Sequence, residues 1–205
     1  MIRARIDPSS IFIGVTLYKV LQSTFMSGVG SLSDANGGLI CERVSSPVLK
    51  KASLYHLFID VLLQTVPAAM ICMWGFSVHW TGGLVYLLTA QVMGLLVFGV
   101  GMSIAGPLNK IPDIQALVKY ILMVGFYTSP TMIPMHKMEG IHYKINEYNP
   151  FSYFVEFVRF NSDIPTTFPD LQIHLLAVII LFMSTLTIIG LNRFDDLRWR
   201  MSSWS

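Results

Sequence analysis

Long apolar runs separated by short polar segments make up most of the chain. A helix that crosses a bilayer needs about 20 mostly apolar residues. Four segments meet this requirement, and the clearest of them carries no charge. The four segments are residues 54–78, 84–108, 114–135 and 172–191, of which 84–108 is the clearest and 172–191 is also free of charged residues. This pattern predicts an all-α integral membrane protein.

A fifth segment, less apolar than the others, precedes them. Residues 11–29 are long enough to cross a bilayer, although they include Lys19 and Gln22. We therefore predict about five spans within a single domain of 205 residues. A loop over residues 30–53 should follow the first span, and a long segment over residues 136–170 should separate the last two.

The composition agrees with a membrane protein and argues against several other classes. Hydrophobic residues make up 53% of the chain and charged residues 13%, whereas soluble domains carry about 25% charged residues. The net charge of +2 is too small for a nucleic-acid-binding surface. Cys41 and Cys72 are too few and too far apart for a metal site. No nucleotide-binding loop or hydrolase motif is present, so we expect no catalytic residue, metal or cofactor on this chain.

Lysine and arginine are concentrated in three short segments, which predicts the orientation of the chain. These are the loop with Arg43, Lys50 and Lys51, the loop with Lys110, and the tail with Arg193, Arg198 and Arg200. With five spans all three fall on one side, and basic loops stay in the cytoplasm. We therefore predict a cytoplasmic C-terminus. Arg3 and Arg5 conflict with the outer N-terminus that this requires, as if the first segment does not cross or a preceding helix is missing.

Polar side chains inside the predicted spans are candidates for function, because leaving them in lipid is costly. His56, Asp60 and Gln64 follow one another at four-residue spacing and share one face of their helix. Lys19 on the first span is a possible partner for Asp60. We weigh three roles for this face: a polar contact that fixes helix packing, the lining of a polar path, and proton transfer.

Small residues recur along the predicted span over residues 84–108. They are Gly94, Gly99, Gly101, Ala105 and Gly106. Small side chains let helices approach closely in lipid, so we expect this helix to pack tightly against its neighbours.

The predicted outer segment contains a short helix with a polar pair. Asn149 is a good N-cap and Pro150 a good first helical residue, so residues 151–160 should be helical. A helix of about ten residues is too short to span, and it should lie at the outer interface or dip into it. Glu156 and Arg159, three residues apart, can pair with each other or with neighbours. This helix is either an interfacial anchor or a gate over a transport path.

Four local patterns occur in a characteristic order along the chain. They are Ser31-Leu32 with Asn36, Leu39-Ile40, Arg43 and Pro47; Ile104 to Asn109 with Asp113; Phe126 to Pro130; and Asn149-Pro150 with Glu156 and Arg159. Together they resemble the permease subunits of ABC-2 type transporters, especially those that export O-antigen, capsule or teichoic-acid polymers.

The resemblance implies a homodimer with six spans per subunit and both termini in the cytoplasm. It also implies a cytosolic ATPase subunit, which holds ATP and Mg²⁺ and docks on a coupling segment. The coupling residues are then Asn36, Leu39, Ile40, Glu42, Arg43 and Pro47. The family has an amphipathic helix and a further span before the segment that starts at residue 11, so the chain is expected to be an N-terminally short member.

The resemblance also suggests residues for the transport path. Residues 135–161 match the position of the family's outer re-entrant helices, which makes Asn149, Pro150, Glu156 and Arg159 the gate residues. Polysaccharide exporters of the family line their path with aromatic side chains. The matching candidates are Tyr18, Phe25, Tyr86, Phe98 and Tyr127, although aromatic residues in membrane helices are often only packed.

The expected function is export of a lipid-linked polysaccharide or polyol-phosphate polymer across the cytoplasmic membrane of a bacterium. Fold does not decide the cargo, and drug or small-molecule efflux is the nearest alternative. The chain could instead be an intramembrane lipid-modifying enzyme with His56 and Asp60 as an acid–base pair, or a non-transporting subunit or remnant. The expected partners are the ATPase, a second copy of the chain, membrane lipid and a lipid-linked glycan, but no nucleic acid.

Overall fold

A computed structural model describes residues 7–38, 46–108, 113–168 and 173–202. All regular structure in these residues is helical, which confirms the predicted all-α class. The elements are α1 (Pro8–Gly38), α2 (Ser46–Gly75), α3 (Trp80–Leu108), α4 (Ile114–Thr128), the 3₁₀ turn η1 (Met135–Lys137), α5 (Gly140–Glu147), α6 (Pro150–Asn161) and α7 (Ile173–Ser202).

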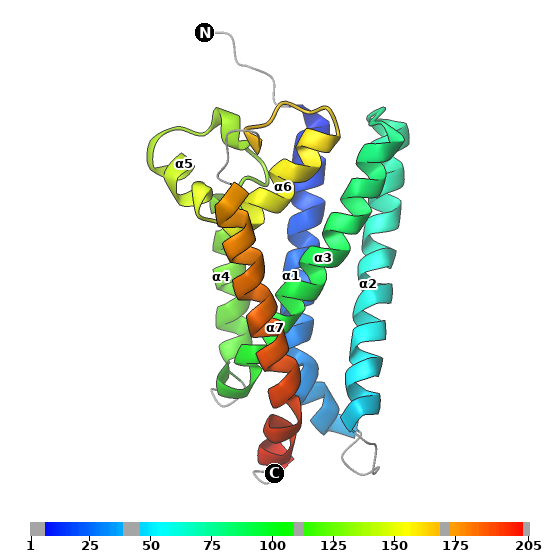
Figure 1. The fold of residues 1–205 in the computed structure, drawn as a ribbon, viewed down its shortest axis with the longest axis vertical. Coiled ribbons are helices and arrows are strands. Elements are labelled where there is room, and N and C mark those ends of the chain that lie inside the picture. The colour runs from blue at the N-terminus through cyan, green and yellow to red at the C-terminus, as the bar shows by residue number, and fades with distance from the viewer. Residues whose placement is uncertain (1–6, 39–45, 109–112, 169–172, 203–205) are drawn as a thin grey trace.

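Five long helices lie side by side, and two short helices cover one end of the bundle (Figure 1). The start of α1 lies at the same end as α5 and α6, which we name the α6 end. The end of α7 lies at the opposite end, here named the tail end, where α1 leads to α2 and α3 leads to α4. The helix ends that flank the three basic segments therefore meet at the tail end.

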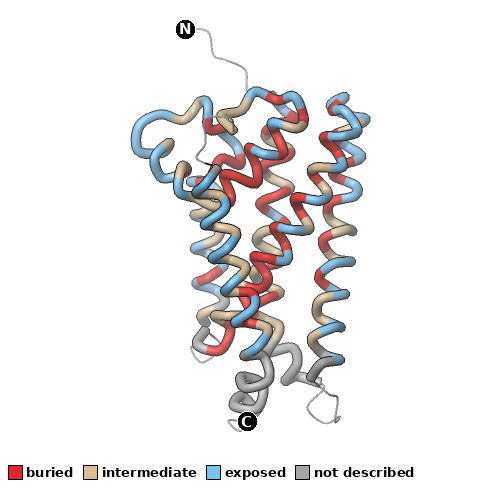
Figure 2. Tube along the Cα trace, viewed as in Figure 1, coloured by how far each residue is buried: buried red, intermediate tan, exposed pale blue. Residues whose placement is uncertain are grey.

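Helix α3 is the centre of the bundle, because it packs against α1, α2, α6 and α7. Buried positions are concentrated along α3 and the side of α1 that faces it (Figure 2). Large apolar side chains on α2 instead face outward, as Leu63 and Trp74 do with 70% and 76% of their surface exposed. An outward apolar face of this kind suits contact with lipid.

Two helices in the described part of the chain are long and apolar enough to cross a membrane. They correspond to residues Lys50–Gly75 and Trp80–Gly106. The apolar parts of α4 and α7, Ala116–Thr128 and Leu176–Asn192, are shorter. Helix α1 has the length, at 31 residues, but contains more polar positions. The number of helices that cross the membrane stays a prediction.

The predicted span over residues 114–135 is a continuous helix only over its first two-thirds. Helix α4 ends at Thr128 after 15 residues, which corresponds to about 22 Å at 1.5 Å per residue. Ser129 is extended, with φ −87° and ψ 165°, because the proline that follows it disfavours helical backbone. A second proline, Pro134, then precedes η1.

The predicted loop over residues 30–53 is mostly helical. Helix α1 continues to Gly38, and α2 begins at Ser46 with Pro47 in its first turn, where a proline is tolerated. Asn36 and Pro47 therefore lie in helices. The coupling residues Leu39, Ile40, Glu42 and Arg43 lie outside the described residues.

Gly99 and Gly101 of α3 lie where neighbouring helices approach closely, as the small-residue pattern predicted. A Cβ atom on Gly101 would lie 2.5 Å from the carbonyl oxygen of Phe25, and one on Gly28 would lie 2.3 Å from that of Phe98. A Cβ atom on Gly99 would meet the side chain of Thr187 on α7 at 2.1 Å. Close approach of α3 to α1 and to α7 therefore depends on residues without side chains.

We expect Gly101→Ala to destabilise the protein, because the added methyl group must push α1 away from α3. Overpacking of this kind costs about 1–3 kcal/mol of unfolding free energy. Gly75→Ala is the matched control, since its Cβ would meet only a side-chain atom of Ile71 at 3.7 Å. Thermal unfolding in detergent should show a lower melting temperature for Gly101→Ala only. Equal stability of both variants would contradict the close α1–α3 contact.

Candidate functional site

Helix α6 forms as its sequence predicted. The side-chain oxygen of Asn149 accepts a hydrogen bond from the backbone N–H of Phe151 at 3.1 Å, and Pro150 occupies the first turn. Eight of the twelve side chains of α6 are buried, whereas Phe157 and Phe160 remain exposed. The helix packs against α1 and α3. It is thus part of the packed bundle, which does not fit a simple anchor on a lipid surface.

A buried ion pair lies on α6. A nitrogen of the Arg159 guanidinium lies 2.7 Å from a carboxylate oxygen of Glu156, and both side chains are fully buried. The predicted pairing of these two residues is therefore confirmed. Removing two charges from water is costly unless their remaining hydrogen-bonding groups also find partners.

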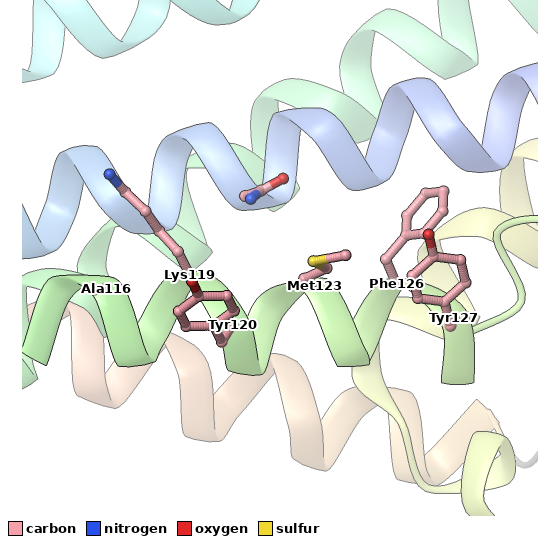
Figure 3. Close-up of a pocket in the computed structure, with 7 residues that line it drawn as sticks. Ala116, Lys119, Tyr120, Met123, Phe126 and Tyr127 are labelled. Atoms are coloured by element: carbon pink, nitrogen blue, oxygen red, sulfur yellow. The ribbon is translucent and has the colours of Figure 1, made fainter.

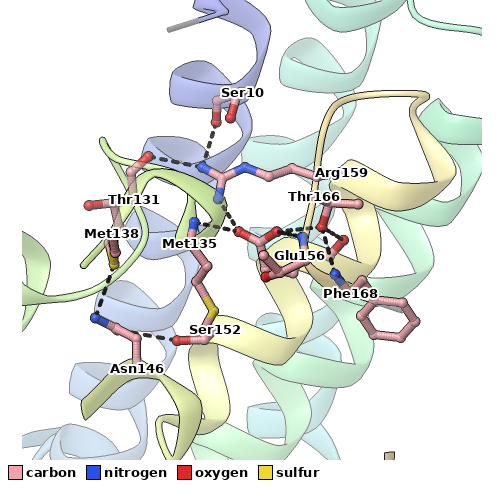
Figure 4. A network of polar contacts seen from close by, with 11 residues as sticks. Ser10, Thr131, Met135, Met138, Asn146, Ser152, Glu156, Arg159, Thr166 and Phe168 are labelled. Carbon is pink, nitrogen blue, oxygen red and sulfur yellow. Dashed lines mark hydrogen bonds and ion pairs between the residues drawn. The ribbon is translucent and has the colours of Figure 1, made fainter. Parts of the chain in front are cut away.

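Arg159 reaches two segments that are far from α6 in the sequence. Its second terminal nitrogen donates to the backbone carbonyl of Ser10, in the first turn of α1, at 2.9 Å. The same nitrogen donates to the carbonyl of Thr131, in the segment after α4, at 3.3 Å (Figure 4). One side chain thus joins α6 to α1 and to the segment that follows α4.

The carboxylate of Glu156 holds two further segments. One oxygen, which also accepts from Arg159, accepts the backbone N–H of Met135 in η1 at 3.2 Å. The other accepts the hydroxyl of Thr166 and the backbone N–H of Thr167, the latter at 3.3 Å (Figure 4). We name this group the α6 cluster; it comprises Ser10, Thr131, Met135, Glu156, Arg159, Thr166 and Thr167. It joins five parts of the chain around one ion pair.

The Arg159 guanidinium of the α6 cluster is buried but remains charged. Burial lowers the pKa of Arg159 from its ordinary value, and the neighbouring Glu156 carboxylate opposes that shift. Arginine remains protonated in proteins, so the guanidinium keeps its charge. Its Nε atom is buried without a hydrogen-bond partner among the described residues. The cluster is therefore nearly, but not fully, satisfied.

Asn146 holds α5 to the same end of the bundle. Its amide nitrogen donates to the carbonyl of Thr128, the last residue of α4, at 2.8 Å. Its side-chain oxygen accepts from the hydroxyl of Ser152 on α6 at 3.2 Å. Sequence reasoning missed Asn146, although the sequence shows this amide three residues before the Asn149 N-cap. It also missed Ser10 and Thr131, which act through backbone carbonyls and carry no side-chain signal.

A groove of about 510 Å³ runs between α1 and α4 (Figure 3). The main lining residues are Gln22, Lys119, Tyr120, Met123, Phe126 and Tyr127. The side chains of Tyr120 and Tyr127 are about two-thirds exposed, at 67% and 66%. The groove therefore offers aromatic rings, an amide and one ammonium group on an open side of the bundle. We name it the α1–α4 groove.

The polar face of α2 makes a helix-packing contact. The amide nitrogen of Gln64 donates to the Asp60 carboxylate at 3.1 Å, and the hydroxyl of Ser23 on α1 donates to the Gln64 amide oxygen at 3.2 Å. His56 and Lys19 are exposed, and within the described residues neither is hydrogen-bonded to Asp60. The predicted Lys19–Asp60 contact is therefore wrong. Lys19 lies one turn before Ser23 on α1, whereas Asp60 lies one turn before Gln64 on the antiparallel α2, so the two are axially displaced.

The candidate path aromatics divide into two groups. Tyr18, Tyr86 and Phe98 are buried inside the subunit, and Phe25 packs against the same core. Tyr18 makes edge-to-face contacts with Phe126 and Phe151, each with ring centroids 5.2 Å apart. Of the five, Tyr127 alone is exposed and lines the α1–α4 groove. The three buried rings and the partly buried Phe25 have the packing role in this conformation.

The described residues include no group of three or more His, Cys, Asp or Glu side chains that could hold a metal ion. Cys72 is buried in the apolar core.

The family model for ABC-2 type transporters matches residues 24–162, more than half of the chain. The chain belongs to the ABC-2 type transporter family. It is a membrane protein and the permease component of an ABC transporter, and ABC-2 permeases generally pair with an ATPase subunit. A comparison with curated proteins gave no match.

The matched range relates the permease family to both candidate sites. It contains Glu156 and Arg159 of the α6 cluster, and it contains all the α4 residues of the α1–α4 groove. Ser10, Thr166 and Thr167 lie outside it. The partners of the ion pair thus extend beyond the part of this permease that the family model covers.

We expect Arg159→Met to destabilise the permease strongly, because it leaves the Glu156 carboxylate buried without its countercharge. Breaking a buried pair from one side costs about 3–5 kcal/mol of unfolding free energy. Combining it with Glu156→Gln removes both charges, so the double variant should lose less than the sum of the two single losses.

Thermal unfolding of the four proteins in detergent gives this comparison. Lys144→Met, on the exposed surface of α5, serves as the control and should leave stability unchanged. Additive losses in the double variant would show that Glu156 and Arg159 do not act as a pair.

Proposed function

We propose that this permease exports a lipid-linked polysaccharide or polyol-phosphate polymer across the cytoplasmic membrane of a bacterium. The α1–α4 groove is the observation that supports the proposal. Tyrosine rings offer flat apolar faces with a hydroxyl at the edge, a combination that suits sugar rings. Gln22 and Lys119 add hydrogen-bond donors for hydroxyl or phosphate oxygens.

An ATPase subunit with ATP and Mg²⁺ is the proposed source of energy, acting through Asn36, Leu39, Ile40, Glu42, Arg43 and Pro47. Helix α1 is the proposed transmission element. Its last turns contain Asn36, while its first turn accepts the hydrogen bond from Arg159. At 31 residues it is about 46 Å long, so a displacement at the tail end reaches the α6 cluster through one continuous helix.

The proposed orientation has the tail end in the cytoplasm and the α6 end outside, with Asn149, Pro150, Glu156 and Arg159 at the outer gate. The described helix ends that flank the basic segments lie at the tail end, which supports this orientation. A second copy of the chain is the proposed partner on the open side of α1 and α4, so that the polymer passes along the contact between the two copies.

Two alternatives to polymer export differ in their support. Drug or small-molecule efflux stays open, because Met123 and Phe126 give the groove apolar surface as well. An acid–base pair of His56 and Asp60 finds no support, since the described Asp60 carboxylate bonds to Gln64 and His56 is exposed. A non-transporting subunit or remnant would leave export intact after deletion.

We expect the chain, together with the ATPase encoded beside it, to restore surface polymer in a bacterium that lacks its own polymer permease. Reversing two charges in the coupling segment, with Glu42→Arg and Arg43→Glu, should abolish both ATPase binding and export. Lys144→Glu, on the exposed surface of α5, is the matched charge-reversal control and should retain both.

Surface polymer and co-purification of the ATPase are the two readouts. An intact complex that extrudes a cationic dye but restores no polymer would contradict the proposed cargo. ATPase binding that survives both charge reversals would contradict the proposed coupling segment.

A further inference from the structure

We infer that the α1–α4 groove binds the phosphate group of a membrane lipid, and that Lys119 is the residue that pairs with it. The inference deepens the proposed function, because a lipid-linked polymer carries such a phosphate.

The charge of the two helices that form the groove is the first argument. Residues 8–33 of α1 contain Lys19 and no acidic residue, and α4 contains Lys119 and no acidic residue. Neither lysine forms an ion pair within the described part of the chain, and both are exposed. Uncompensated ammonium groups on helices in a membrane are costly, so an anion from outside the chain should accompany them.

Gln22 and Lys119 lie at the same level of the α1–α4 groove. Helices α1 and α4 run in opposite directions (Figure 1), and the hydroxyl of Tyr18 donates to the carbonyl of Leu122. One turn further along α1 lies Gln22, and about one turn back along α4 lies Lys119, so both are at the same level. Lys19, three residues before Gln22, shares its side of α1.

The hydrogen-bonding groups of the groove suit a phosphate. The Lys119 ammonium and the Tyr120 and Tyr127 hydroxyls can all donate, and Gln22 adds an amide nitrogen. A phosphate group carries acceptor oxygens and negative charge, so it complements the Lys119 ammonium and the hydrogen-bond donors nearest to it. Charge-assisted bonds of this kind are stronger than bonds between neutral groups.

The depth of Lys119 favours a lipid as the source of the phosphate. The residue lies five positions after the start of α4, about 8 Å along the axis from the tail end of the helix. A headgroup can reach that depth without crossing the apolar centre of the bilayer. The exposed side chains of Leu117, Ile121 and Val124 then offer an apolar surface for the lipid chain.

Native mass spectrometry of the purified permease with dioleoyl phosphatidic acid tests the inference. We expect one saturable lipid per chain, and roughly ten-fold weaker binding for Lys119→Gln, which is about 1.4 kcal/mol. Lys119→Arg should stay within a few-fold of the natural protein, because it keeps the charge. Lys144→Gln, on the exposed surface of α5, is the matched control and should bind normally.

Two further probes decide between possible sources of affinity. Dioleoyl glycerol, which lacks the phosphate, should bind at least ten-fold more weakly than phosphatidic acid. Inorganic phosphate at millimolar concentration should not displace the lipid. Equal binding of both lipids, full displacement by inorganic phosphate, or unchanged binding by Lys119→Gln would each overturn the inference.

Lys119→Gln should fold normally because Lys119 is exposed, and its melting temperature verifies this. Should the variant fail to fold, Gln22→Ala, which removes the amide that lines the groove, is the second test, and binding as tight as that of the natural protein would then overturn the inference. Lipid binding without polymer export would retain the phosphate site and reject the polymer as cargo. Polymer export with no lipid binding would retain the polymer as cargo and reject the phosphate site.

Discussion

The buried Glu156–Arg159 pair is the interaction on which the α6 end of the molecule depends. Two charges without water are tolerated only when their hydrogen-bonding groups are satisfied, and here the partners come from separate parts of the chain. The pair thereby fixes where α1 begins, where the segment after α4 runs, and how α6 enters the bundle. Backbone groups of the irregular segments at this end are hydrogen-bonded to one acidic side chain, Glu156, and one basic side chain, Arg159.

Helix α3 packs closely against α1 and α7, whereas α4 packs loosely beside α1. Gly28, Gly99 and Gly101 bring α3 against α1 and α7, which makes these helices a rigid unit. Helix α4 makes few contacts with α1 along its length, and the α1–α4 groove lies between them. A long α1 that is held at one end by Arg159 and leads towards the proposed coupling segment at the other can link the two ends of the permease.

Local chemistry was predictable from the sequence, whereas contacts through backbone were not. The Asn149 cap, the Glu156–Arg159 pairing and the glycine packing of α3 each depend on residues close in sequence or on residue size alone. The carbonyls of Ser10 and Thr131 had no signal, because every residue carries the same group. The supposed Lys19–Asp60 contact failed because sequence spacing does not set the relative level of antiparallel helices.

Amide hydrogen exchange of the detergent-solubilised permease, compared with Arg159→Lys, tests the central role of the ion pair most directly. Lysine keeps the charge but cannot donate to Glu156, Ser10 and Thr131 together. We predict faster exchange in residues 129–137 and 164–168 and in the first turns of α1, with α2 and α3 unchanged. Exchange that is unchanged in those segments, or raised evenly along the chain, would contradict the account.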